Sequence, residues 1–179
     1  AEPESWNIDP ARIEEKITAR TKAIMPVSIF GHPCEMDQIW AIAQHYGLQV
    51  IEDAAESHGA EYKGKKTGNL ADITAFSFFA NKNLTTGEGG MVVTDNESLY
   101  NSCRYYRNVC FALDGPRDYR HEDIGFNYRL SNLHAAIGVA QVEKADDYRN
   151  LRIRNGKLYR KYLEGIDGVQ LQHTQNDVV

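Results

Sequence analysis

Three side chains of this sequence have types and positions that suit a single cofactor: Asp53, Ser77 and Lys82. Asp53 ends an apolar run, and Lys82 stands in a polar turn five residues after Ser77. Pyridoxal phosphate needs a lysine amine that bonds to its aldehyde and a carboxylate that keeps its pyridine nitrogen protonated. Its phosphate needs hydroxyl and backbone N–H groups, which Ser77 could help to supply. The combination therefore suggests a pyridoxal-phosphate site.

Each of these residues also has a simpler interpretation when it is taken alone. A lysine in a turn is usually solvated, and an aspartate after a strand often caps a helix or stabilises a turn. A serine in a strand is most often an edge hydroxyl. Spacing alone does not establish the cofactor site, because unrelated Asp and Lys residues at strand ends are common.

The elements that must position these residues indicate an α/β fold. The run TKAIMPVSIFG predicts a strand within 21–31, EMDQIWAIAQHYG predicts a helix that ends at Gly47, and LQVIED predicts a strand that ends at Asp53. This order indicates a parallel pair of strands with a crossover helix. Ligands of such sheets bind at the carboxyl ends of the strands, where Asp53 lies. One face of the helix is expected in the core: Met36, Ile39, Trp40, Ala43 and Tyr46.

Two further strands are predicted within 72–80 and 89–95, on either side of the turn that contains Lys82. About four strands are fewer than a doubly wound sheet normally has, so we expect the middle part of a larger fold. The remaining expectations are short helices over 10–18 and 97–106, a long functional loop over 109–129, and a long helical pattern from Ser131 through LYRKYLEG.

Composition excludes several classes of partner. The chain has 179 residues and a net charge of -5, and its basic residues are scattered, which argues against nucleic-acid binding. It has no apolar run of about 20 residues and no signal-peptide pattern at its first residues, so we expect a cytoplasmic protein without membrane contact. The three cysteines, Cys34, Cys103 and Cys110, fit reduced thiols better than disulfides.

The histidines show no spacing typical of metal ligands, so no metal site is predicted. They are His32, His45, His58, His121, His134 and His173. His58 could touch a ligand or could be a satisfied structural histidine, and the sequence favours neither. The glycines of GEGG, residues 87–90, lack the pattern of a nucleotide phosphate loop and more simply allow a tight turn beside Lys82.

Specific motifs resemble one known family. The segments VIEDAAESHGAEYKGKKTGNLADITAFSFFANKNLTTGEGGMVVTDN and IGFNYRLSNLHAAIGVAQVEK resemble the DegT/DnrJ family of pyridoxal-phosphate sugar aminotransferases, and the resemblance extends from about Asn7 to Tyr162. The E-D-A-A strand end, the S-F-x-x-x-K turn, the T-T-G-E-G-G segment and the G-x-N-x-R block occur in the order of the family.

The resemblance implies a role for six residues. Lys82 matches the lysine that bonds to the cofactor, Asp53 the partner of the pyridine nitrogen and Ser77 a phosphate ligand. Ala55 matches the small residue under the ring. Glu56 stands near the ring hydroxyl, where many relatives carry Gln, and resembles the perosamine synthase branch in this respect. In a separate block, Asn127 matches an asparagine that reaches the phosphate of the neighbouring subunit, which implies a homodimer with shared active sites.

The implied fold is the large domain of a fold-type I pyridoxal-phosphate transferase, with residues 1–150 as its central part and 151–179 as a helix that leads toward a C-terminal small domain. The implied reaction moves an amino group, with glutamate as donor, to a keto group of a nucleotide-linked deoxyhexose. A related sugar dehydratase carries His in place of the lysine, so Lys82 argues against it. A non-catalytic protein on this fold, or a chain of this length that is inactive, stays open as an alternative.

Overall fold

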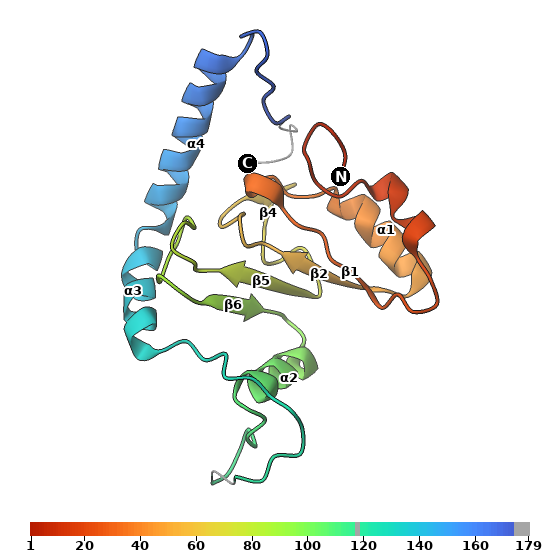
Figure 1. Cartoon of the computed structure of the whole chain (residues 1–179), viewed down its shortest axis with the longest axis vertical. Helices are drawn as coiled ribbons and strands as arrows, with labels where there is room; N and C mark the ends of the chain where they lie inside the picture. The colour runs from red at the N-terminus through yellow and green to blue at the C-terminus, as the bar shows by residue number, and fades with distance from the viewer. Residues whose placement is uncertain (117–118, 174–179) are drawn as a thin grey trace.

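The fold is built around a four-stranded sheet with the order β1-β2-β5-β6 (Figure 1). The computed structural model describes residues 1–116 and 119–173. Strands β1 (Ala23–Ile24), β2 (Gln49–Asp53) and β5 (Ile73–Ser77) are parallel, whereas β6 (Gly90–Val93) runs antiparallel to β5. The predicted α/β class with a mostly parallel sheet is therefore confirmed.

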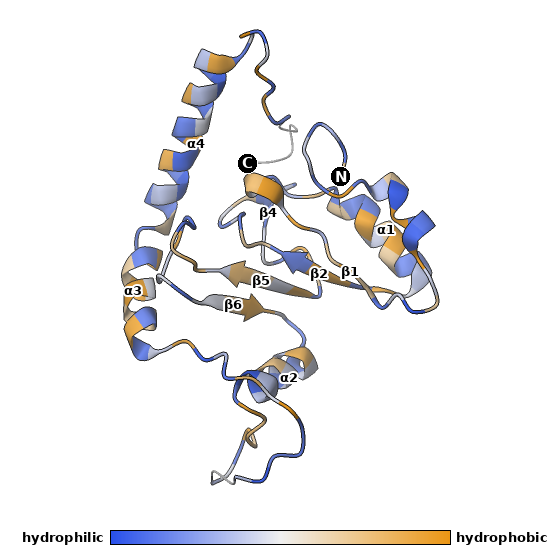
Figure 2. Cartoon of the chain, viewed as in Figure 1, coloured by the Kyte–Doolittle hydropathy of each residue, from blue (hydrophilic) through white to orange (hydrophobic). Residues whose placement is uncertain are grey.

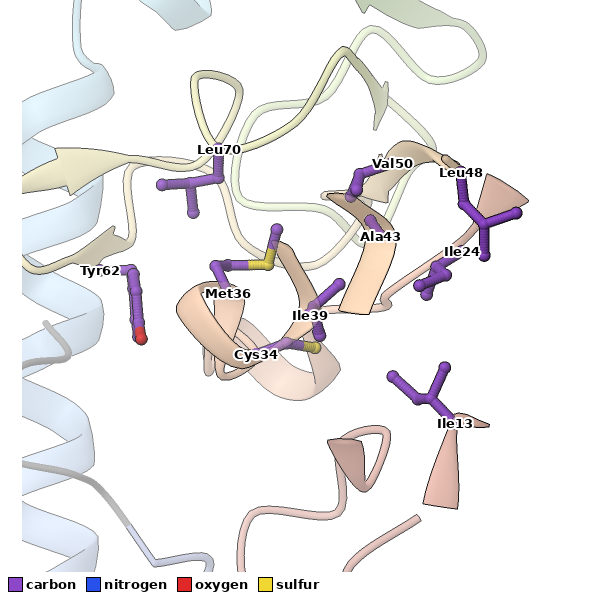
Figure 3. Close-up of a cluster of buried hydrophobic side chains, with 10 residues drawn as sticks. All are labelled: Ile13, Ile24, Cys34, Met36, Ile39, Ala43, Leu48, Val50, Tyr62 and Leu70. Atoms are coloured by element: carbon purple, nitrogen blue, oxygen red, sulfur yellow. The ribbon is translucent and has the colours of Figure 1, made fainter. Parts of the chain in front are cut away.

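Helix α1 (Met36–Tyr46) crosses over between β1 and β2, as predicted. It ends at Gly47, which adopts a left-handed conformation that a residue without a Cβ tolerates well. Ile39 is fully buried in the cluster of apolar side chains drawn in Figure 3, and the indole of Trp40 donates a hydrogen bond to the Leu70 carbonyl at 2.7 Å. The expectation for Tyr46 was wrong: it lies in the last turn of α1 and is 42% exposed.

Two predicted elements near the start of the chain are shorter than expected. The helix expected over 10–18 consists of two separate 3-10 turns, η1 (Pro10–Arg12) and η2 (Glu14–Lys16), because so short a segment gains few hydrogen bonds for the cost of nucleation. The strand expected within 21–31 is limited to β1. Pro26 lacks an N–H group that could continue the ladder, and the 3-10 turn η3 (Ile29–Gly31) follows.

The sequence between β2 and β5 forms a small antiparallel hairpin of β3 (Glu61–Tyr62) and β4 (Lys65–Lys66). Beyond the sheet, α2 (Glu97–Arg107) agrees with the prediction, and the described residues 108–116 and 119–131 that follow it contain no helix or strand. The long helical pattern predicted from Ser131 is confirmed as helical, and it consists of two helices, α3 (Asn132–Val142) and α4 (Ala145–Leu163). Two aspartates in the first turn of α4 favour a new helix N-terminus there.

The boundary predicted at residue 151 does not coincide with an element boundary, since α4 begins at Ala145 and ends at Leu163. Residues 164–173 contain no helix, and 174–179 of the predicted helical range lie outside the described residues. Figure 2 shows hydrophilic residues along much of α4, none of whose residues is buried. Within the described ranges, no helix is both long and apolar enough to cross a membrane.

A buried carboxyl group stabilises the side of the sheet opposite to Asp53. Glu52 is 1% exposed, and one of its oxygens, Oε2, accepts hydrogen bonds from the Gly68 N–H and the Thr74 hydroxyl, both at 2.9 Å. Its other oxygen has no hydrogen-bond partner among the described residues. Burial raises the pKa of Glu52 because the charged form loses its solvation, although the two hydrogen bonds oppose this effect.

Removing core volume at Ile39 should destabilise the fold. We expect Ile39→Ala to lower the free energy of unfolding by about 2 to 5 kcal/mol, through lost apolar burial and the cavity left behind. Tyr46→Ala, on the same helix but exposed, is the matched control and should change the free energy of unfolding by less than about 1 kcal/mol. Urea denaturation measures both; similar losses for the two variants would contradict this description of the core.

The raised pKa of Glu52 predicts a pH dependence of stability. The folded-state pKa of Glu52 lies above the unfolded value of 4.5. Its contribution to the free energy of unfolding is therefore fully present below pH 4.5 and is lost as the pH rises through the folded-state pKa. Glu52→Gln cannot titrate, so its stability relative to the unsubstituted chain should increase between about pH 4 and pH 8. Urea denaturation at several pH values, with the exposed Glu14→Gln as control, tests this; a constant difference would contradict it.

Candidate functional site

The ends of β2 and β5 bring Asp53 and Ser77 to one edge of the sheet (Figure 1). Asp53 pairs in register with Ala75 of the parallel neighbour β5. Side chains alternate along a strand, so Ser77, two residues beyond Ala75, lies on the same face as Asp53. The loop that follows Ser77 carries Lys82. Residues from two separate parts of the sequence therefore lie around one sheet edge.

The amine of Lys82 lies beside a carboxylate of this site. Its Nζ is 3.9 Å from Glu56 Oε1, and the lysine side chain is only 18% exposed. This exposure does not fit the simpler interpretation of Lys82 as a freely solvated lysine in a turn. The second oxygen of Glu56 accepts a hydrogen bond from the Phe30 N–H at 2.9 Å. Glu56 is thus fixed through one oxygen while the other faces the amine.

Asp53 and Ser77 are each oriented by a local hydrogen bond. Asp53 Oδ1 accepts from the Ala55 N–H at 3.0 Å, and Ser77 Oγ accepts from the Phe79 N–H at 3.3 Å. The first contact is the turn-type hydrogen bond expected of an ordinary aspartate. The other carboxylate oxygen of Asp53 bonds to none of the described residues, so it can pair with a ligand.

The residues at this edge fit pyridoxal phosphate. They provide an amine, a carboxylate and a hydroxyl, which are the groups that the aldehyde, the pyridine nitrogen and the phosphate require. The side chain between Asp53 and Ser77 on the shared face is the small and exposed Ala75, and Ala55 is equally small. Neither of these two side chains would obstruct a flat ring that approaches this face of the sheet.

His58, whose role the sequence left open, packs against aromatic rings. Its ring centroid is 5.3 Å from that of Phe76 and 5.9 Å from that of Phe78. Burial lowers the pKa of His58 and the positive charge of Lys82 lowers it further, although the backbone of Ser77 acts in the opposite direction. Neither ring nitrogen has a hydrogen-bond partner among the described residues. These contacts favour a neutral, packed imidazole beside the site.

Asn127 lies apart from the other predicted site residues. Its backbone forms an isolated bridge with Asn108 after α2, and its Oδ1 accepts a hydrogen bond from Arg129 Nε at 3.2 Å. It is exposed and makes no hydrogen bond to Asp53, Ser77 or Lys82 within the described ranges. The fold of one chain does not bring it to the cluster.

The residues that hold the loops of the site carry no signal of this role in the sequence. Phe30 contacts Glu56, as described above; Gln141 accepts a hydrogen bond from Thr85, and Arg149 donates one to Gly59. Gly59 and Arg149 are 90 positions apart, and no local pattern pairs residues at such a distance. In the part of the chain that the structure describes, no group of three or more His, Cys, Asp or Glu side chains could hold a metal ion.

Comparisons with known proteins show what the whole chain is similar to. The chain is 46% identical to a GDP-perosamine synthase of Escherichia coli O157:H7, over 98% of the chain and 47% of the relative. It is 48% identical to a GDP-perosamine synthase of Caulobacter vibrioides, over 86% and 41%. The solved sugar aminotransferase CalS13 from Micromonospora echinospora matches with a TM-score of 0.90 and 30% identity, over 99% of this chain and 51% of that chain.

The predicted fold, part of a sugar aminotransferase, is confirmed by these matches. The chain spans about half the length of the curated relatives it matches. A family model described as the DegT/DnrJ/EryC1/StrS aminotransferase family matches residues 1–179. The chain belongs to that family.

Proposed function

We propose that this chain forms the cofactor-binding part of an enzyme that transfers an amino group to a keto group of a nucleotide-linked deoxyhexose. The observation that carries the proposal is the placement of Lys82, Asp53 and Ser77 around one edge of the sheet. The family uses pyridoxal phosphate, and two relatives are GDP-perosamine synthases, which favours a GDP-linked keto sugar as the acceptor. The product would serve the synthesis of surface polysaccharide.

The residues of the site divide the binding of pyridoxal phosphate among them. Asp53 would hold the pyridine nitrogen in its protonated form, and Ser77 would bind the phosphate. Ala55 would lie under the ring and Glu56 near its hydroxyl. When bound, the cofactor supplies an electron sink for the negative charge that develops on the carbon of the amino donor.

Lys82 would hold the cofactor and then move the proton. Once free, its amine can take a proton from the α carbon of the amino donor, for which we propose glutamate. The same amine can then return this proton to a neighbouring carbon. The carboxylate of Glu56, 3.9 Å from Lys82 Nζ, can stabilise the ammonium form between these two steps. The same amine would serve the second half of the reaction, in which the keto sugar accepts the nitrogen.

The complete site would need a second subunit. Asn127 is exposed and lies apart from Lys82 within one chain, which supports our proposal that it reaches the phosphate bound by the neighbouring subunit of a homodimer. In this proposal residues 1–150 form the central part of the large domain and 151–179 lead toward a small domain. We place the enzyme in the cytoplasm, where the free thiols Cys34, Cys103 and Cys110 would stay reduced.

The attachment of pyridoxal phosphate should depend on Lys82. We expect the chain mixed with the cofactor to gain a visible absorbance band and a mass increase at Lys82 after borohydride reduction. Lys82→Ala should lose both, because among the described residues it is Lys82 whose amine pairs with Glu56 at this sheet edge, whereas the exposed Lys65→Ala should retain both. An unsubstituted chain without a reducible adduct would refute the proposal for this polypeptide.

The charge of Asp53 should affect the chemistry more than the attachment. Asp53→Asn keeps the size of the side chain but removes the charge that favours a protonated ring nitrogen. We expect it to slow the half-reaction with glutamate by about 100-fold or more while Lys82 still attaches the cofactor. Single-turnover absorbance measurements test this, with the exposed Asp95→Asn as control. Equal rates for the two variants would contradict the role of Asp53.

A further inference from the structure

We infer that Gln141 of α3 and Arg149 of α4 are positioning residues that together hold the amine of Lys82 opposite the carboxylate of Glu56. Each side chain reaches from its helix to one of the two loops that carry these groups. The inference rests on the proposed function only for its catalytic consequence, because the contacts that it describes lie within this chain.

Arg149 fixes the loop that contains Glu56. Its Nε donates a hydrogen bond to the Gly59 carbonyl at 2.7 Å, and its Nη2 lies 3.4 Å from Glu61 Oε1. The side chain is 22% exposed, so these contacts are partly shielded from water. Gly59 has a φ of +79°, and a Cβ there would lie 3.0 Å from Arg149 Cδ, which shows how closely the arginine stem covers this backbone. The loop is therefore held directly against α4.

The ion pair contributes less to this attachment than the hydrogen bond to Gly59. Glu61 Oε1 also accepts from Lys66 Nζ at 3.2 Å, so it keeps a cationic partner if Arg149 is removed. The Gly59 carbonyl has no second donor among the described residues. The guanidinium can reach both groups because its N–H donors are arranged in a fixed fork.

Gln141 fixes the loop that contains Lys82. Its Oε1 accepts a hydrogen bond from the Thr85 N–H at 3.3 Å, three residues beyond the lysine. The loop is bonded internally, since the Thr86 N–H donates to the Phe78 carbonyl at 2.9 Å and the Phe78 N–H donates to the Gly89 carbonyl at 2.8 Å. A hydrogen bond from another element, here from Gln141 of α3, can therefore orient this loop as a unit.

The two contacts share one support, because only a short bend separates α3 from α4. The Lys144 N–H donates to the Gln141 carbonyl at 3.1 Å within this bend. In Figure 1 the loop between β5 and β6 lies next to α3 and the beginning of α4. The separation of 3.9 Å between Lys82 Nζ and Glu56 Oε1 is thus set through one helical junction, and small misplacements of a reacting amine cost rate.

Chemical labelling of Lys82 tests this inference without the cofactor. We would react the chain with an amine-specific ester and measure the labelling rate of each lysine by mass spectrometry, with exposed Lys65 as internal reference. Lys82 should react slowly in the unsubstituted chain, because it is largely buried and ion-paired. Arg149→Leu and Gln141→Leu should each raise its labelling rate by about 10-fold, since each removes one hydrogen bond that holds a loop.

Conservative variants and one control separate positioning from general stability. Arg149→Lys and Gln141→Glu retain a donor and an acceptor, respectively, so both should restore most of the slow labelling. Arg154→Leu changes an exposed arginine of the same helix whose side chain bonds to none of the described residues, and it should leave the rate unchanged. Thermal melting of every variant shows whether faster labelling merely follows a loss of folded protein.

The possible outcomes distinguish this inference from the proposed function. It is overturned if the Leu variants label Lys82 no faster than Arg154→Leu, or only in proportion to their lower melting temperature. It is supported if labelling accelerates in the folded variants and the conservative variants restore it, even where the unsubstituted chain forms no cofactor adduct. In that case the proposed function alone would fail. Where the adduct does form, its rate of formation should fall about 10-fold in the Leu variants.

Discussion

Strand β2 pairs in parallel with β5, and the register of this pair decides which side chains share a face of the sheet. Asp53 stands opposite Ala75, and Glu52 opposite Thr74. A slip by one residue would turn Asp53 to the other face and bring Glu52 to the site edge. The position of the carboxylate relative to Ser77, and with it the proposed cofactor site, therefore depends on this single register.

The two faces of the pair use neighbouring carboxyl groups in opposite ways. Glu52 is buried and accepts hydrogen bonds from the Thr74 hydroxyl and the Gly68 N–H. These contacts fix the register from the face of the sheet opposite to Asp53. Asp53 keeps one oxygen available at the edge. The sheet thus separates a carboxyl group that is hydrogen-bonded in the interior from one that we propose binds a ligand, although the two are adjacent in the sequence. This division depends on the alternation of side chains along a strand.

The apolar core and the site are supported by different parts of the chain. The main cluster of buried apolar residues lies between Ile13 and Leu70, around α1 and the first two strands (Figure 3). Helices α2, α3 and α4 contain no buried residue. The loops of Glu56 and Lys82 therefore receive their outer support from polar contacts with α3 and α4, whose strength depends on geometry more than on buried area.

Local signals in the sequence determined the elements that end at the site. Apolar runs and the glycine at position 47 predicted α1 and β2 together with the strand end at Asp53, and specific motifs identified Lys82 and the family. These signals succeed because strand alternation, helix periodicity and capping act over a few residues. The same local reasoning predicted Tyr46 in the core, which was wrong because neighbouring elements decide burial. It predicted a helical pattern after Ser131 without locating the break between α3 and α4.

Only the tertiary structure decided which distant residues meet. It made β6 antiparallel, placed Glu56 3.9 Å from the amine of Lys82, and joined Arg149 to Gly59 across 90 positions of the sequence. It also left Asn127 away from the cluster within one chain. Such contacts depend on how complete elements pack against one another, and side chains that carry them have no periodicity or local propensity that a sequence pattern could reveal.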